Sequence, residues 1–461
     1  MAILEMSVEA REIRAISESY LSKIWQHQLL DKTELRTEDG ELVAIIYPGR
    51  INDDHGADFR DAVITTSRGL IKGDVELHIK SSGWREHRHH QDVAYNRVIL
   101  HVVMWHNAKT VTKLQNGQDV PILALNKYLN NPLSQKLNSA SSRTILQMPC
   151  LQIGRRPTTN TITRLLESAG KARFLAKAAR FQTDLTQIRA SQSLYQGIMG
   201  ALGYSKNKLP MLKLAHILPL HLLESMTGSE KSDEECLIYQ QSLLLGTAGL
   251  LLSQCPERYQ RGQLADRWLD KLESIWASFQ GTEVMSYHDW HLFKVRPNNS
   301  PLRRLVAMSY LLLRYRQEGI LDAVVNLVKE APANHGHRHL GEGLAVTTDD
   351  YWANHFDFSS GRRESPTLLG SGRVADITVN VLLPFTFAWG QFIYQTDLAG
   401  KAIDLYRSYP RLPTNSVEKH MTEQLSLSSS LVNSAQRQQG LIHIYNNWCT
   451  QGRCDCCRLA G

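Results

Sequence analysis

Residues 56–84, GADFRDAVITTSRGLIKGDVELHIKSSGW, decide the expected fold of the first third of the chain. The runs AVITTS and GDVELHIKSS are rich in β-branched residues, and SRGLIKG between them carries turn-forming residues. This pattern predicts two consecutive strands joined by a tight connection.

The flanking sequence extends the pattern in both directions. Upstream, apolar positions recur at helical spacing over residues 7–30, and LVAIIYPG follows as a short strand that ends in a Pro-Gly turn. Downstream, RVILHVVMWH predicts a further strand, and TVTKL and VPILAL flank the turn QNGQD. The polar stretch GWREHRHHQDVAYN could form a connecting helix. We therefore expect a helix, a curved β-meander, a connecting helix and further strands, an α/β or α+β core of about 130 residues.

The sequence changes character from about residue 160. Long segments such as TITRLLESAGKARFLAKAARF and CLIYQQSLLLGTAGLLLSQC have helical periodicity, and strand signals nearly vanish. We predict an α/β domain at residues 1–150, a mainly helical domain at 151–445 and a cysteine-rich tail at 446–461. The length of 461 residues exceeds the usual size of one hydrophobic core, which agrees with more than one packed unit.

Composition limits the classes of function. Contents of 42% hydrophobic and 21% charged residues are ordinary for a folded globular protein. No apolar run approaches the roughly 18 residues of a membrane span, and the first residues are amphipathic and acidic, so we expect a cytoplasmic protein that does not enter membranes. A net charge of +7 with a pI near 8.9 favours the approach of a polyanion such as nucleic acid.

Two carboxylates belong to the central pair of strands. Asp58 lies just before the first strand and Glu76 within the second, so the turn between the strands can bring both to one sheet edge. Hard oxygen ligands of this kind suit Mg²⁺, which keeps several waters and takes further oxygens from a phosphate. Such a metal ion acidifies an attacking water and neutralises charge on a scissile phosphate. Because side chains alternate along a strand, Glu76, His78 and Lys80 share one face, and His78 or Lys80 could orient the nucleophile.

These residues resemble the signature of the PD-(D/E)XK nuclease superfamily, in which an aspartate and a (D/E)xK triplet lie across a β-hairpin preceded by a helix. The resemblance implies cleavage of phosphodiester bonds with Mg²⁺ or Mn²⁺ as cofactor. Asp58 matches the motif aspartate, and Glu76 matches the acidic residue of the triplet. Two positions depart from the pattern, because Ala57 stands where proline is usual and His78 stands at the lysine position, with Lys80 two residues later. Some branches of the superfamily tolerate replacement of that lysine, and inactive members also carry such a replacement.

The segment after the hairpin is expected to bind substrate. Gln91 and Tyr95 have a Q-x-x-x-Y spacing similar to that of recombination-type nucleases, which implies contact with nucleic acid, and on a helix they would share a face. His89 and His90, together with His87, could bind phosphate, act as an acid or ligate a metal, and a hydrated surface loop is the alternative. In the next strand, we expect His101 to be a core histidine with satisfied hydrogen bonds.

A basic motif occurs later, in FKVRPNNSPLRRL. Arg296, Arg303 and Arg304 could bind phosphate oxygens through their guanidinium groups. The start of a helix explains Asn299 and Pro301 equally well.

The tail WCTQGRCDCCRLAG places Cys449, Cys454 and Cys457 at C-x₄-C-x₂-C spacing, with Cys456 beside them. Thiolates this close suit Zn²⁺ or an Fe–S cluster, and a simple reactive tail is the alternative. The fourth ligand could be Cys456, Cys150 or His443.

Over its whole length the chain also resembles an uncharacterised bacterial family marked by GDVE-H, RP-N-P--RL and WC----C--C, but this resemblance implies no activity. We expect a metal-dependent nuclease whose partner is nucleic acid. One alternative is an inactive scaffold of the same fold that binds nucleic acid or protein, and another is an unrelated hydrolase built on the histidines and zinc.

Overall fold

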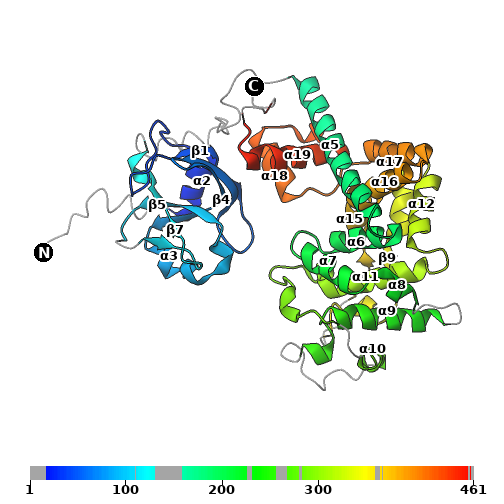
Figure 1. Ribbon diagram of the computed structural model, residues 1–461. Coiled ribbons are helices and arrows are strands. Elements are labelled where there is room, and N and C mark those ends of the chain that lie inside the picture. Colours follow the sequence, from blue (N-terminus) through cyan, green and yellow to red (C-terminus); the bar gives the residue numbers. More distant parts are fainter. Residues whose placement is uncertain are drawn as a thin grey trace. The chain divides into compact units, whose positions relative to one another are not determined.

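The chain divides into two compact units (Figure 1). The N-terminal unit comprises Met1–Ala169, Thr414–Leu431 and Gln439–Gly461, and the helical unit comprises Gly170–Pro413 and Val432–Gln438. The sequence-based boundaries at residues 150 and 445 did not anticipate that two late segments belong to the N-terminal unit. The computed structural model describes residues 17–108, 111–129, 158–225, 231–255, 267–279, 283–358, 364–365, 367–454 and 457.

A six-stranded mixed sheet forms the centre of the N-terminal unit, in the order β1-β3-β4-β5-β8 with β2 paired to β3. The β1–β3 and β3–β4 pairs are antiparallel, whereas β5 is parallel to β4 and β8 is parallel to β5. The expected mixture of helix and sheet is confirmed, but the sheet is not a simple meander. The strands are β1 (Ala44–Tyr47), β2 (Arg50–Ile51), β3 (Phe59–Thr66), β4 (Gly69–Lys80), β5 (Val98–Trp105) and β8 (Ile122–Ala124), and a separate ribbon pairs β6 (Thr112–Lys113) with β7 (Asp119–Val120).

One face of this sheet forms a hydrophobic core. Alternate residues of β4, Val75 and Leu77, pack there with Leu100 and Val102 of β5. Helix α2 (Glu18–His27) contributes Leu21, Ile24 and Trp25 to the same core. Each such side chain stabilises the fold by about 1.5–3 kcal/mol when fully buried. The intervening residues of β4 therefore face the opposite side, where polar groups gather.

Two glycines allow the strands to meet. Gly69 has a φ of +96° where the chain turns from β3 into β4, a conformation that favours glycine. Gly73 lies where β4 passes the beginning of β5, and a Cβ atom there would lie 2.4 Å from the carbonyl oxygen of Arg97. The GDVE segment consequently lies very close to its parallel neighbour.

The link between β4 and β5 contains the predicted connecting helix only in part. It consists of α3 (Gly83–Glu86) and two 3₁₀ turns, η1 (His89–Gln91) and η2 (Val93–Tyr95). Arg88, with a φ of +61°, interrupts the helix after one turn and redirects the chain. This short crossover places its side chains directly over the polar face of β4.

The helical unit is predominantly α-helical, as the sequence predicts. Its centre is α9 (Asp233–Thr247) against α10 and α11 (Pro301–Arg314), the latter capped by the Ser300 hydroxyl. The other helices that lie in or enter this unit are α5 (Thr159–Leu185), α6 (Ala190–Leu202), α7 (Lys208–Ile217), α8 (Leu220–Ser225), α10 (Arg267–Ala277), α12 (Ile320–Glu330), α13 (Gly336–Leu344), α14 (Tyr351–Asn354), α15 (Ser371–Ile377), α16 (Leu383–Phe392) and α17 (Thr396–Ser408), with a small β9 (Val346–Thr347) and β10 (Thr367–Leu369) pair.

One helical segment has the length and composition of a membrane span. Within the described residues, Asp233–Gln254 alone passes this test, and 83% of its apolar window is buried inside the protein. Burial of this extent is typical of a core helix, and it explains why the segment is so apolar.

The late segments pack onto the first strands within the N-terminal unit. They contain α18 (Ser416–Gln424) and most of α19 (Ala435–Asn447). The Tyr47 hydroxyl lies 2.6 Å from Nε2 of His420 on α18, and the Tyr445 hydroxyl of α19 donates to Asp61 Oδ2 at 2.9 Å. Residues more than 350 positions apart are therefore part of one folded unit.

Candidate functional site

The two predicted carboxylates lie together on the polar side of the sheet. The backbone N–H of Asp58 donates to Glu76 Oε2 at 3.0 Å, and the backbone N–H of Leu77 donates to Asp58 Oδ2 at 3.0 Å. Each carboxylate is thus held by the strand that carries the other. Two carboxylates held in this way are oxygen ligands of the kind that Mg²⁺ prefers.

The electrostatic environment of this pair disfavours its negative charge. Burial raises the pKa of Glu76 to about 8. Burial and the neighbouring Glu76 raise the pKa of Asp58 to about 7. Glu18, the first residue of α2, adds negative charge that raises both pKa values further. A bound cation would relieve the repulsion among these acids.

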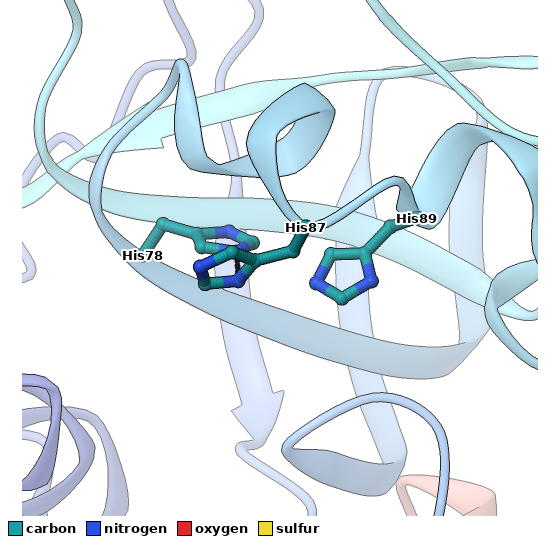
Figure 2. Close-up of side chains that lie close together, drawn as sticks. All are labelled: His78, His87 and His89. Carbon is teal, nitrogen blue, oxygen red and sulfur yellow. Dashed lines mark hydrogen bonds between the residues drawn. The ribbon is translucent and has the colours of Figure 1, made fainter.

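Three histidines lie beside Glu76, and Figure 2 shows their imidazole rings gathered over β4. His78 comes from the strand, and His87 and His89 come from the crossover that follows it. One ring nitrogen from each lies within 4.8 Å of those of the other two. His78 Nε2 is 3.1 Å from His87 Nδ1, and His89 Nε2 is 3.1 Å from Glu76 Oε1. Among the described residues, this is the one group of three or more histidine, cysteine or acidic side chains with metal-ligand spacing.

A chain of buried polar groups fixes the ring of His78. Its Nδ1 lies 3.0 Å from Nε2 of His101, and Nδ1 of His101 lies 3.0 Å from the Thr112 hydroxyl. Parallel pairing places Glu76 opposite His101, which brings these side chains to one face. The expectation that His101 is a core histidine with satisfied hydrogen bonds is confirmed, since it is fully buried and bonded at both nitrogens.

Burial keeps the inner histidines neutral. Burial and the adjacent histidines lower the pKa of His78 to about 2, and burial and neighbouring histidines lower the pKa of His101 to about 3. Burial also lowers the pKa of His89, against the opposing charge of Asp58. Neutral imidazole is the form that ligates metal ions.

Aromatic packing positions His89. Its ring stacks on Tyr95 with centroids 3.9 Å apart and meets the edge of Trp84 at 5.4 Å. Gly83 is needed below the cluster, because a Cβ atom there would come within 2.5 Å of the His78 ring. These contacts hold the crossover against β4.

Other predicted site residues of the N-terminal unit lie in different surroundings. Lys80 is exposed at the last position of β4, and His90 is half-buried. Gln91 is exposed whereas Tyr95 is buried, and they occupy separate 3₁₀ turns. The predicted shared helix face of Gln91 and Tyr95 is therefore wrong, because the helix ends at Glu86.

The three arginines of the helical unit differ in environment. Arg296 is exposed at the start of a 3₁₀ turn. Arg303 is fully buried, and its guanidinium group donates to carbonyl oxygens that include those of Trp352 and Ser365. Arg304 is also buried and donates to the Leu368 carbonyl and to side-chain oxygens. The surroundings of Arg303 and Arg304 argue against the expected binding of substrate, since their donors hold loops of the protein itself.

The described cysteines of the tail do not form a compact ligand group. Cys449 is buried in a 3₁₀ turn, and Cys454 and Cys457 are partly buried. The Cys454 thiol lies 3.9 Å from the Ile46 carbonyl oxygen. Cys456 and the possible ligand Cys150 lie outside the described residues, and His443 lies on α19 with its Nδ1 3.3 Å from the Asn447 amide. The zinc or Fe–S site of the tail stays a prediction.

The sequence alone did not indicate that His78 lies beside His87 or that Glu18 contributes to the electrostatics of the site. The dense run of histidines at residues 87–90 was the available signal for the histidine cluster. Whether these side chains meet His78 depends on the turn at Arg88. An acidic residue in the first turn of a helix is common for reasons of the helix dipole, so Glu18 gave no distinct signal.

Comparison with protein families identifies a relationship over most of the chain. A family model described as a protein of unknown function (DUF2851) matches residues 18–413. The chain belongs to this family. The match includes the carboxylates, the histidines and most of the helical unit, and it agrees with the expected uncharacterised family. Searches of the curated proteins and of the solved structures each gave no match.

Proposed function

We propose that the N-terminal unit is a metal-dependent nuclease that hydrolyses phosphodiester bonds of nucleic acid. The observation that carries the proposal is the pair of backbone hydrogen bonds, from Asp58 N–H to Glu76 and from Leu77 N–H to Asp58, which fixes the buried Glu76 carboxylate close to that of Asp58. Structures rarely hold two such acids together without a compensating cation or proton. The location of both acids on a hairpin preceded by a helix also agrees with the resemblance to PD-(D/E)XK nucleases.

Asp58 and Glu76 are the residues that would hold Mg²⁺ or Mn²⁺. When bound, that ion would supply positive charge to phosphate oxygens and lower the pKa of a water. His78 cannot replace the charge of the usual lysine, because its pKa is lowered to about 2 and its ring nitrogens face His101 and His87. Exposed Lys80, two residues further along β4, is the candidate for contact with a phosphate. The net charge of +7 supports a polyanionic substrate.

A matched set of variants tests the proposal. We expect the full-length protein to cleave labelled single-stranded or duplex DNA or RNA in the presence of Mn²⁺ or Mg²⁺. Glu76→Gln and Asp58→Asn should abolish cleavage, because each keeps the side-chain shape and removes one anionic ligand. Glu86→Gln is the control, since Glu86 is an exposed carboxylate on the neighbouring α3. Cleavage that survives both substitutions, or cleavage absent from metal-loaded wild type, would refute the nuclease proposal.

A non-catalytic scaffold that binds nucleic acid or protein is the second candidate. The neutral His78 at the motif lysine position favours it, because an uncharged ring there would not stabilise a phosphate in the transition state as a lysine does. Such a scaffold should bind labelled nucleic acid or a protein partner without cleaving it, and its binding should be unaffected by Glu76→Gln.

A further inference from the structure

We propose that His78, His87 and His89, with Glu76, form a binding site for a divalent transition-metal ion of the Zn²⁺ type. This site is separate in its ligands from the Mg²⁺ site proposed above, apart from the shared Glu76, and it does not depend on nuclease activity. Imidazole nitrogen is a preferred ligand of Zn²⁺, whereas Mg²⁺ prefers oxygen.

The distances among the ligand atoms fit such an ion. Two nitrogens bound at about 2.0–2.1 Å to a tetrahedral Zn²⁺ lie roughly 3.3 Å apart. His78 Nε2 and His87 Nδ1 are 3.1 Å apart, and all three histidines have a ring nitrogen within 4.8 Å of the others. Glu76 Oε1 lies 3.9 Å from His78 Nε2 and 3.1 Å from His89 Nε2. Small rotations of the side chains would bring four donors around one ion.

An unsatisfied nitrogen points to the same position. Nε2 of His89 is buried, and although it lies 3.1 Å from Glu76 Oε1, no hydrogen bond of suitable geometry joins it to any of the described residues. A buried polar atom without a hydrogen bond is destabilising by about 1–3 kcal/mol, and a metal ion bound to this nitrogen would offset that cost. Stacking on Tyr95 prevents the ring from turning away to reach water.

The surroundings of the cluster resemble the support that metal-bound histidines need. The bond between His101 and His78 Nδ1 orients Nε2 of His78 into the cluster, and Thr112 in turn holds His101. Histidine ligands commonly use their second nitrogen in this way. His87 is exposed, so the site has an open side through which an ion and one further ligand can enter.

The test is a titration of the full-length protein, stripped of metal, with Zn²⁺ by calorimetry, together with Co²⁺ titration followed by visible absorption. We expect tight binding that millimolar Mg²⁺ does not displace. His87→Gln should weaken it by at least roughly tenfold, since loss of an outer-shell partner alone has effects of about 10–100-fold. His87 is exposed, so this variant should fold normally. His90→Gln, in the 3₁₀ turn that follows His87, is the matched control and should bind as wild type does.

Several outcomes would overturn the inference. Absence of stoichiometric Zn²⁺ binding, or equal binding by the wild type and a His87→Gln, His89→Gln double variant, would refute it. Co²⁺ spectra dominated by thiolate charge-transfer bands would assign the metal to the cysteine tail instead. Asp58→Asn separates the two proposals, because it should abolish Mg²⁺-dependent cleavage while it leaves Zn²⁺ binding nearly unchanged.

Discussion

Glu76→Gln should stabilise the metal-free protein at alkaline pH while it abolishes metal binding by the carboxylate pair. The folded protein holds a proton on Glu76 up to about pH 8, whereas the unfolded chain loses it near the ordinary value of 4.5. The wild-type protein therefore loses stability as the pH rises from 4.5 through 8. Glutamine has no charge to bury, so the stability advantage of the variant should grow across that window.

The magnitude follows from the same two pKa values. The difference between 8 and 4.5, at 1.36 kcal/mol per pH unit, sets an upper limit of about 5 kcal/mol at pH 9. The variant introduces an amide NH₂ group beside the histidines. If this buried group makes no hydrogen bond, it lowers the stability of the variant by about 1–3 kcal/mol and offsets part of the gain. We expect a net gain of about 2–4 kcal/mol at pH 9 and no gain at pH 5, where the charge of Glu76 accounts for less than about 1 kcal/mol.

Hydrogen exchange of peptides from β4 and β5 measures this effect in the N-terminal unit separately from the helical unit. Wild type and variant are compared at the same pH in chelator, and then with Mg²⁺, which should protect the wild type alone. Ligand at about 100 times its Kd would add about 2.7 kcal/mol to the wild type. Equal or faster exchange in the variant at pH 9 would show that the Glu76 charge is already compensated, and the reasoning would fail.

Three other changes are informative. His101→Leu removes the hydrogen bond to His78 and should weaken Zn²⁺ binding roughly 10–100-fold in chelator competition, and unchanged affinity would exclude His78 as a ligand. Burial and the Arg50 charge lower the pKa of His420 to about 4, so its contribution to stability is present above pH 6.5 and is lost as the pH falls toward 4. His420→Gln should flatten acid unfolding in that window, and an unchanged profile would contradict this. Arg303→Met leaves buried carbonyls without donors and should lower stability by about 3 kcal/mol in thermal unfolding, whereas a wild-type Tm would exclude a structural role.

The sequence predicted the strands well because their local patterns are strong. Alternation in GDVELHIK separates the core-facing Val75 and Leu77 from the polar-facing Glu76 and His78, as the structure has them. The parallel pairing of β4 with β5 was missed, because alternation identifies a strand but not its partner. The return of α18 and α19 was missed for a related reason, since their partners lie hundreds of residues away.

The candidate site was predictable only where neighbouring strands determine it. Asp58 and Glu76 are brought together by a hairpin, which the sequence indicates directly. His87 and His89 come together because Arg88 adopts a left-handed backbone conformation. Arginine rarely adopts this conformation, so the sequence does not predict the turn. Arg303 suggested a phosphate contact because a guanidinium group matches phosphate oxygens. The carbonyls that surround it come from residues about 50–60 positions later, which no local pattern indicates.

The packing of α18 and α19 onto the first strands has a consequence for how the chain is made. During synthesis the N-terminal unit cannot be completed until the segments beyond residue 414 are made, whereas most of the helical unit, Gly170–Pro413, is already available to fold. Long-range contacts of this kind slow folding, and until they form, the surface of the early strands stays open to solvent and to association. Fragments that end near residue 150 should therefore aggregate or bind chaperones, so biochemical work on this unit requires the entire chain.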